Sequence, residues 1–139
     1  MAFTSIQKIR FDDVDGAGIV YYPQFFHLCH AAFEDFFDTA APISYPALVK
    51  ERRLGFPTVA ITSEFKAPLS YGDVAVVALT VRKIGRSSLA VAYDIRRKRD
   101  GALTFHADIT TVLVNLDTLK PAEIDAELRG IFEKFLSAS

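Results

Sequence analysis

The chain has 139 residues, half of them hydrophobic, which is enough to bury a sizeable core, so we expect one domain over residues 1–139. Its 17 acidic and 16 basic residues nearly cancel, which argues against nucleic acid or an anionic membrane surface as a partner. The single cysteine excludes an internal disulfide framework, and neither a signal peptide nor an apolar run of spanning length is recognisable, so we expect a soluble, cytoplasmic protein.

The N-terminal segment predicts a strand, an acidic loop and a long helix, in that order. Alternating side chains predict a strand over Ser5–Phe11. Three carboxylates and two glycines follow between residues 12 and 18. Pro23 suits the first turn of a helix, because its missing N–H would be unpaired there in any case, and we expect this helix to extend to about Thr39.

The predicted helix has a broad aromatic face. At the helical period its apolar side chains fall on one wide arc and its polar side chains on the opposite arc, so most of the helix should be covered. His30 lies at the edge of the apolar arc. The apolar arc contains Phe25, Phe26, Cys29, Phe33, Phe36 and Phe37, and the polar arc contains Gln24, His27, Glu34, Asp35 and Asp38.

Four consecutive strands are predicted after a connection over residues 40–55 that includes one short helix. The period changes to two after Pro57, and turn residues separate strands that end near residues 69, 84, 99 and 116. Pro121 then opens a last amphipathic helix. Because the sheet needs a cover on one face, the sequence predicts an α+β fold in which a curved antiparallel sheet wraps around the long central helix.

The acidic loop is the best candidate for chemistry. A carboxylate beside a helix N-terminus combines a reactive group with unpaired N–H donors and the positive end of the helix dipole, which suits acyl chemistry. The same carboxylates can equally form a solvated turn that caps the helix. We assign that structural role to Asp12 and Asp13, of which Asp13 can also hold the loop by accepting backbone hydrogen bonds.

The sequence resembles a known family at this loop. Residues 13–23, DVDGAGIVYYP, are similar to the signature of the 4-hydroxybenzoyl-CoA thioesterases and related acyl-CoA thioesterases, in which Asp-x-Asp-x-x-Gly-x-Val-x-Tyr/His precedes the central helix. A second similar segment is residues 85–89, GRSSL, and the resemblance covers nearly the whole chain. It implies the hotdog fold, and an α+β chain of the predicted element order fits that fold.

The resemblance implies two catalytic groups. Asp15 corresponds to the family's catalytic carboxylate, which can either attack the thioester carbonyl and form a mixed anhydride or deprotonate a water molecule. Tyr22 corresponds to the residue whose backbone N–H polarises that carbonyl. Gly16 and Gly18 are expected to allow the unusual backbone angles and the close approach of the substrate that this chemistry requires.

The resemblance also implies substrate contacts. His30 stands where the 4-hydroxybenzoyl enzyme has an acidic residue facing the acyl group, so we expect it to line the acyl pocket rather than to serve only as a core histidine. The segment with Lys83, Arg86, Ser87 and Ser88 corresponds to the turn that contacts the phosphates of CoA. A solvated hairpin turn is the alternative reading of that segment.

Family members assemble with their active sites between subunits, so the resemblance implies a homo-oligomer, either a dimer or a tetramer. In such an assembly Asp15 would meet groups of a neighbouring subunit, for example within residues 57–63. The predicted function is an acyl-CoA thioesterase that acts on a small aromatic or short acyl group without a metal or redox cofactor. A hotdog dehydratase or hydratase using His30, and a non-catalytic acyl-CoA-binding module, are the alternatives.

Overall fold

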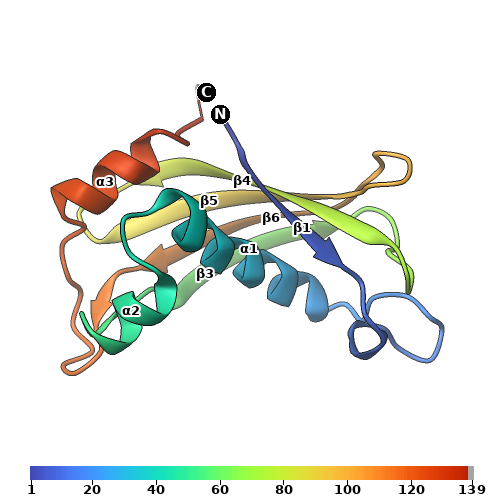
Figure 1. Cartoon of the computed structure of the whole chain (residues 1–139), viewed down its shortest axis with the longest axis horizontal. Coiled ribbons are helices and arrows are strands. Elements are labelled where there is room, and N and C mark those ends of the chain that lie inside the picture. Colours follow the sequence, from blue (N-terminus) through green and yellow to red (C-terminus); the bar gives the residue numbers. More distant parts are fainter. Residues whose placement is uncertain (138–139) are drawn as a thin grey trace.

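The computed structural model describes residues 1–137, and it shows a curved antiparallel sheet that wraps around one long helix, α1 (Figure 1). The predicted α+β hotdog arrangement is therefore confirmed. None of the helices in this part of the chain has the length and apolar character needed to cross a membrane. The elements are β1 (Phe3–Lys8), α1 (Gln24–Ala40), α2 (Tyr45–Lys50), β2 (Leu54–Gly55), β3 (Thr58–Phe65), β4 (Val74–Ile84), β5 (Ser88–Arg97), β6 (Leu103–Val112), β7 (Val114–Asn115) and α3 (Ala126–Glu133).

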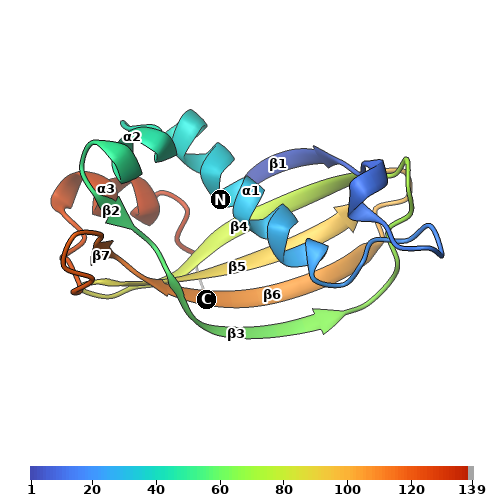
Figure 2. The ribbon, with the colours of Figure 1, turned by 90° about the horizontal axis from the view of Figure 1, so that it is seen from below.

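The strand order in the main sheet is β1-β4-β5-β6-β3, so β1 and β3 are its edges. The helix α1 lies in the concavity of this sheet (Figure 2). It begins after Pro23, as predicted, and it ends at Ala40 because Ala41 is extended and precedes a proline, which disfavours helical angles.

The core is aromatic and lies between α1, the sheet and α3. Phe25 of α1 stacks on Phe105 of β6 with ring centroids 4.9 Å apart. At the other end of the helix, Phe36 stacks on Phe132 of α3 with centroids 5.7 Å apart. All of the predicted apolar arc is buried except Phe26, which is half-buried. The wide aromatic face of α1 is therefore covered by the rest of the protein, as its width predicted.

The polar arc of α1 is not simply solvated. Asp35 accepts a 2.6 Å hydrogen bond from the hydroxyl of Ser5 and a 2.9 Å hydrogen bond from the amide of Gln7. Both donors belong to β1, so this carboxylate ties the helix to the edge of the sheet.

The structure corrects several predicted boundaries, and the strand expected to end near residue 69 ends at Phe65. The first strand ends at Lys8, because Arg10 N–H donates to the Asp13 carboxylate and the chain turns into a short 3₁₀ segment, Phe11–Asp13. The fourth strand is interrupted at Leu113, whose N–H donates to the β4–β5 turn instead of continuing the ladder. The last helix begins at Ala126 rather than after Pro121, and the Asp125 side chain caps it by accepting the Leu128 N–H over 2.9 Å.

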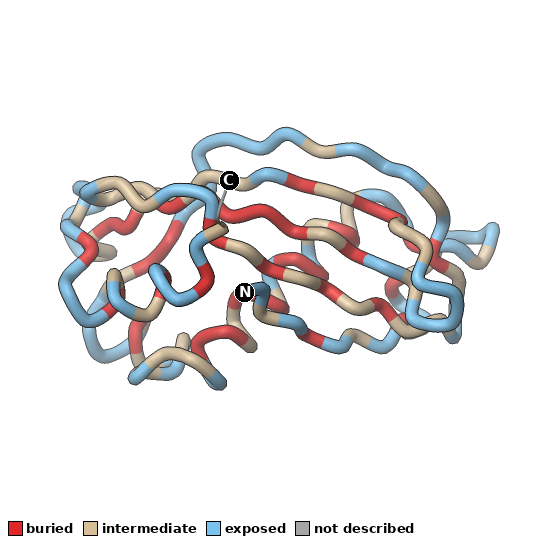
Figure 3. Tube along the Cα trace, turned by 90° about the horizontal axis from the view of Figure 1, so that it is seen from above, coloured by how far each residue is buried: buried red, intermediate tan, exposed pale blue. Residues whose placement is uncertain are grey.

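The outer edge strand β3 is exposed along nearly its whole length (Figure 3). It pairs with β6 on one side, while its other side is open in the described part of the chain. Its apolar side chains Val59, Ile61 and Phe65 are 61%, 45% and 51% exposed. An open edge that carries apolar side chains is unfavourable in a monomer.

Candidate active site

The acidic loop is a tight hairpin at one end of the sheet. Val14 forms an antiparallel bridge with Val20, and within the hairpin the N–H of Asp15 donates to the carbonyl oxygen of Ile19 over 2.9 Å. The N–H of Gly18 returns a 3.0 Å hydrogen bond to the carbonyl oxygen of Asp15. Gly18 has φ +79°, an angle that favours glycine. Gly16 does not have a positive φ, so the expectation of unusual backbone angles holds only for Gly18.

Asp15 lies exposed near the tip of this hairpin. One carboxylate oxygen, Oδ1, accepts the N–H of Ala17 over 2.8 Å, which fixes the orientation of the side chain. The other oxygen has no hydrogen-bond partner within residues 1–137. The loop therefore presents one oriented and available carboxylate oxygen, as a nucleophile or a general base requires.

Asp13 is the structural carboxylate of the loop, as predicted. It is 8% exposed, and its Oδ2 accepts the N–H of Arg10 over 2.8 Å. Its carbonyl oxygen accepts the N–H of Tyr21 over 3.0 Å, which joins the base of the loop to the residue directly before Tyr22. Gln24 in the first turn of α1 donates to the same carboxylate over 3.3 Å.

Tyr22 lies just before the first turn of α1. The carbonyl oxygens of Tyr21 and Tyr22 accept the N–H groups of Gln24 and Phe25 over 2.8 and 3.3 Å. The N–H of Tyr22 itself donates no hydrogen bond to any of the described residues. Its phenol ring is 61% exposed and contacts Phe65 of β3, so the backbone N–H is the group of Tyr22 that is free to act as an oxyanion donor.

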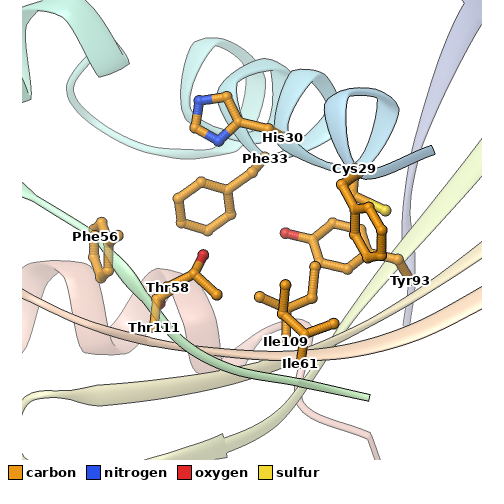
Figure 4. Close-up of a pocket in the computed structure, with 10 residues that line it drawn as sticks. Cys29, His30, Phe33, Phe56, Thr58, Ile61, Tyr93, Ile109 and Thr111 are labelled. Carbon is orange, nitrogen blue, oxygen red and sulfur yellow. The ribbon is translucent and has the colours of Figure 1, made fainter. Parts of the chain in front are cut away.

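A cavity of about 90 Å³ lies between α1 and the inner face of the sheet. Figure 4 shows the side chains that surround it, which come from α1, β3, β5, β6 and the segment between β2 and β3. His30 borders it, but the imidazole is largely exposed and its Nε2 lies 2.9 Å from Oε2 of Glu34. The lining residues are Phe26, Cys29, His30, Phe33, Phe56, Thr58, Ile61, Tyr93, Ile109 and Thr111.

Two buried titratable side chains, Cys29 and Tyr93, line this cavity, and both are uncharged. Burial raises the pKa of the Cys29 thiol to about 12, so it stays protonated at neutral pH and is a core residue rather than a nucleophile. Burial also raises the pKa of Tyr93 well above its ordinary value, so its hydroxyl is a neutral hydrogen-bond donor. Sequence reasoning missed Tyr93, because an alternating strand position gives no sign that a cavity lies beside it.

The predicted CoA-contacting turn is well defined. The N–H of Gly85 donates to the carbonyl oxygen of Ser88 over 2.8 Å, and a Cβ at Gly85 would collide with the Ser88 hydroxyl. Lys83 and Arg86 are exposed, and Ser87 and Ser88 are half-buried. The hydroxyls and cations that suit phosphate thus lie on one short turn.

Two further arginines belong to this region. Arg129 of α3 donates from Nη2 to the carbonyl oxygen of Gly85 over 2.8 Å and so braces the turn. Arg82, Lys83 and Arg129 all line an open groove of about 440 Å³. Arg129 comes from a distant part of the chain, and no local signal in the sequence connects it with this turn.

The predicted site residues do not all come together within one chain. The loop with Asp15 and Tyr22 lies at one end of the sheet, and the turn with Lys83 and Arg86 lies at the opposite end (Figures 1 and 2). The ten residues of β5 separate these ends by about 30 Å, at about 3.3 Å per residue. Within residues 1–137, no group of three or more His, Cys, Asp or Glu side chains is placed to hold a metal ion.

Comparison with known proteins agrees with the resemblance of the acidic loop to the loop of acyl-CoA thioesterases. Residues 9–132 match the Thioesterase-like superfamily. The chain is 30% identical over 95 residues to a 1,4-dihydroxy-2-naphthoyl-CoA hydrolase of Nostoc punctiforme, an alignment that covers 68% of this chain and 64% of that protein. It is 28% identical over 132 residues to the 4-hydroxybenzoyl-CoA thioesterase of Pseudomonas sp. strain CBS-3, with 91% and 94% of the two chains covered.

A solved structure extends this similarity. It is the crystal structure of an Asp→Asn variant of 4-hydroxybenzoyl CoA thioesterase complexed with 4-hydroxybenzoyl CoA. The two chains are 27% identical, superimpose with a TM-score of 0.84, and are covered to 94% and 97%.

Proposed function

This chain belongs to the thioesterase-like superfamily of hotdog proteins, and we propose that it hydrolyses the thioester bond of an acyl-CoA that carries a small aromatic or short acyl group. One observation carries the proposal. The loop that presents the available carboxylate oxygen of Asp15 is hydrogen-bonded to the residue before Tyr22, whose N–H is unpaired in the described structure. Relatives that act on aromatic CoA thioesters, the 4-hydroxybenzoyl and naphthoyl enzymes, support the substrate class.

In the proposed reaction the thioester carbonyl oxygen accepts a hydrogen bond from the N–H of Tyr22. Asp15 either deprotonates an attacking water molecule or attacks the carbonyl carbon itself. Negative charge then develops on the carbonyl oxygen, where the N–H donor and the helix dipole stabilise it. The C–S bond breaks, CoA leaves as the thiolate, and the acid is released, after hydrolysis of the anhydride in the second case.

We place the CoA moiety at the turn with Lys83, Arg86, Ser87 and Ser88. The exposed cations and the turn hydroxyls suit phosphate oxygens, and the groove beside the turn adds the arginines of β4 and α3. Because this turn lies at the end of the sheet opposite Asp15, the complete site requires a second copy of the chain.

We propose that two chains pair through their β3 strands around a two-fold axis. Antiparallel pairing reverses one sheet relative to the other, so the β4–β5 turn of one protomer comes to the end that carries Asp15 of its partner. The exposed apolar side chains of β3 support this interface. We also predict that two such dimers form a tetramer. A cytoplasmic location is likewise a prediction.

The experiment that tests the function is hydrolysis of a panel of acyl-CoA thioesters by the wild type and by Asp15→Asn. Asparagine keeps an oxygen that can accept the Ala17 N–H, so the loop should keep its shape while the carboxylate is lost. We expect kcat to fall by about a hundredfold or more, the scale of losing a main catalytic group. Asp12→Asn, an exposed neighbour, is the matched control. Near-wild-type turnover by Asp15→Asn would exclude the role of Asp15.

One observation favours a second candidate function. The 2.9 Å His30–Glu34 pair at the cavity is the kind of His and acid pair that a hydratase or dehydratase uses. Turnover of an enoyl thioester, with none of the corresponding saturated thioester, would favour that reaction over hydrolysis.

A further inference from the structure

One polar group in the cavity beside α1 has no partner. Tyr93 is 4% exposed, and Figure 4 shows its phenol oxygen directed into the cavity. Within residues 1–137 this hydroxyl makes no hydrogen bond, and its oxygen is not fully enclosed, so it is available to a group that enters the cavity. Tyrosine rather than phenylalanine at this position therefore places a free hydrogen-bond donor in the cavity for a bound ligand.

The rest of the cavity restricts what that ligand can be. Its walls are mainly aromatic and aliphatic, with the rings of Phe26, Phe33 and Phe56 on several sides, so the group that enters is apolar over most of its surface. Its thiol and phenol are both neutral at physiological pH, and its one basic side chain, His30, is already paired with Glu34, so a buried carboxylate or phosphate would find no free compensating cation among the lining residues. The polar part of the ligand is therefore a single neutral acceptor, such as a hydroxyl.

The cavity also lies where an acyl group would extend from the proposed oxyanion site. Phe26, its first residue along α1, is four residues after Tyr22, which is about 6 Å along a helix axis. At about 90 Å³ the cavity is smaller than an engineered cavity of about 150 Å³ that encloses benzene, so it takes in the substituted part of one ring and has no room for a second ring. A long acyl chain does not fit.

We propose that Tyr93 determines the acyl specificity of this protein by donating a hydrogen bond from its hydroxyl to a hydroxyl substituent on a single aromatic ring bound in the cavity. This inference rests on the proposed thioesterase function and names the part of the substrate that the site selects. Tyr93 contacts the substituent and not the reacting atoms, so it acts on the choice of substrate and leaves the chemistry of the thioester unchanged.

The test compares benzoyl-CoA with 2-, 3- and 4-hydroxybenzoyl-CoA, in the wild type and in Tyr93→Phe. The wild type should hydrolyse at least one of the hydroxylated thioesters with a kcat/KM about tenfold above that of benzoyl-CoA, the effect of one neutral hydrogen bond. Tyr93→Phe should remove this preference and leave kcat/KM for benzoyl-CoA within about twofold of the wild type. The matched control is Tyr45→Phe, a neighbouring tyrosine that does not line the cavity, which should leave the preference unchanged.

Each outcome separates this inference from the function on which it rests. If the wild type hydrolyses none of the thioesters, the proposed function fails and the role of Tyr93 fails with it. If the wild type hydrolyses them but shows no hydroxyl preference, or if Tyr93→Phe changes all substrates alike, the function stands and the role of Tyr93 is overturned. Thermal unfolding of each variant shows whether the folded state is kept, and a Tyr93→Leu variant should lose the preference in the same way.

Discussion

The N–H of Tyr21 donates a 3.0 Å hydrogen bond to the carbonyl oxygen of Asp13, so the base of the acidic loop is fixed to the start of α1. The carboxylate of Asp13 accepts the Arg10 N–H at the same time. Replacing Asp13 with alanine leaves that N–H without its acceptor, and we expect the free energy of unfolding to fall by about 1–3 kcal/mol. Urea denaturation measures this loss, and kcat should fall as well, because the loop that carries Asp15 loosens.

The neighbouring aspartate gives the control for this prediction. Asp12 is exposed, and Asp12→Ala should change stability by no more than about 0.5 kcal/mol. Asp13→Asn keeps an oxygen acceptor, so its free energy of unfolding should lie between those of Asp13→Ala and the wild type. Equal losses for Asp12→Ala and Asp13→Ala would show that the loop is not held by the Asp13 carboxylate.

The two glycines of the loop should respond differently to alanine. Gly18 has φ +79°, so Gly18→Ala forces a side chain into the left-handed region and should destabilise the protein by about 1–2 kcal/mol. Gly16 does not have a positive φ, and apart from its chain neighbours no heavy atom of residues 1–137 lies within 4 Å of the place that its Cβ would occupy. Gly16→Ala should therefore be tolerated. Thermal unfolding and kcat of the pair measure the contrast, and similar behaviour of both variants would contradict it.

Much of the fold could be predicted because its signals are local. Pro23, the 3.6-residue aromatic arc of α1 and the Asp100–Gly101 hairpin are each visible within a few residues. The errors occur where tertiary hydrogen bonds determine a boundary. The first strand, β1, ends early because the Asp13 carboxylate accepts the N–H of Arg10 and the chain turns there. The strand β6 ends because the N–H of Leu113 donates to the carbonyl oxygen of Ser87.

The candidate site residues likewise differ in how far the sequence could reveal them. Asp15 and Tyr22 could be proposed from the sequence because their spacing is fixed by one loop and one helix start. Tyr93 and Arg129 could not be proposed, because their positions beside the cavity and the turn depend on which strands and helices pack together. The separation of Asp15 from the β4–β5 turn is likewise a property of the sheet topology and not of the sequence pattern.

Charge reversal at the β4–β5 turn should weaken substrate binding. Lys83 and Arg86 are exposed, and among residues 1–137 Arg86 pairs only with the carboxylate of Glu123, at 3.8 Å. If they contact CoA phosphates, Lys83→Glu and Arg86→Glu should raise KM severalfold and leave kcat nearly unchanged, and the effect should shrink in high salt. Lys120→Glu changes the net charge equally on an exposed side chain and should have no such effect. A loss confined to kcat would assign the turn a different role.

His106 makes the stability of the sheet depend on pH. Its Nδ1 lies 2.8 Å from Asp94 and its Nε2 lies 2.9 Å from Asp108. The hydrogen bond with Asp94, together with the one with Asp108, raises the pKa of His106 above its ordinary value of about 6.5, although partial burial lowers it. The stabilisation is therefore complete below about pH 6.5 and is lost as the pH rises through the raised pKa.

This linkage can be measured by urea denaturation over a pH series. The difference in the free energy of unfolding between the wild type and His106→Gln should be largest at acidic pH and should shrink as the pH rises from about 6.5. Asp94→Asn removes the negative charge of the main hydrogen-bond partner and should weaken the same pH dependence. A difference that is constant over the series would show that His106 gains nothing from its two neighbours.

The exposed edge of β3 should be required for assembly. Val59 is 61% exposed on β3, and Ile6 is 58% exposed on the opposite edge strand, β1. A lysine on an edge strand opposes strand pairing, so Val59→Lys should shift the protein toward a monomer in analytical ultracentrifugation, whereas Ile6→Lys should not. A Val59→Lys protein with an unchanged mass distribution would exclude β3 as the interface.

A mixing experiment then tests whether the active site is shared. Asp15→Asn and Arg86→Glu damage opposite ends of the chain, so each homodimer has two defective sites. In a heterodimer with sites between protomers, one site combines an intact Asp15 from one chain with an intact turn from the other, while the second site carries both substitutions. Random exchange makes about half of the dimers heterodimers, so a mixture unfolded and refolded together should recover about a quarter of wild-type activity at low substrate concentration. If each site were built within one chain, no mixture could recover activity, because every chain would keep its own defect.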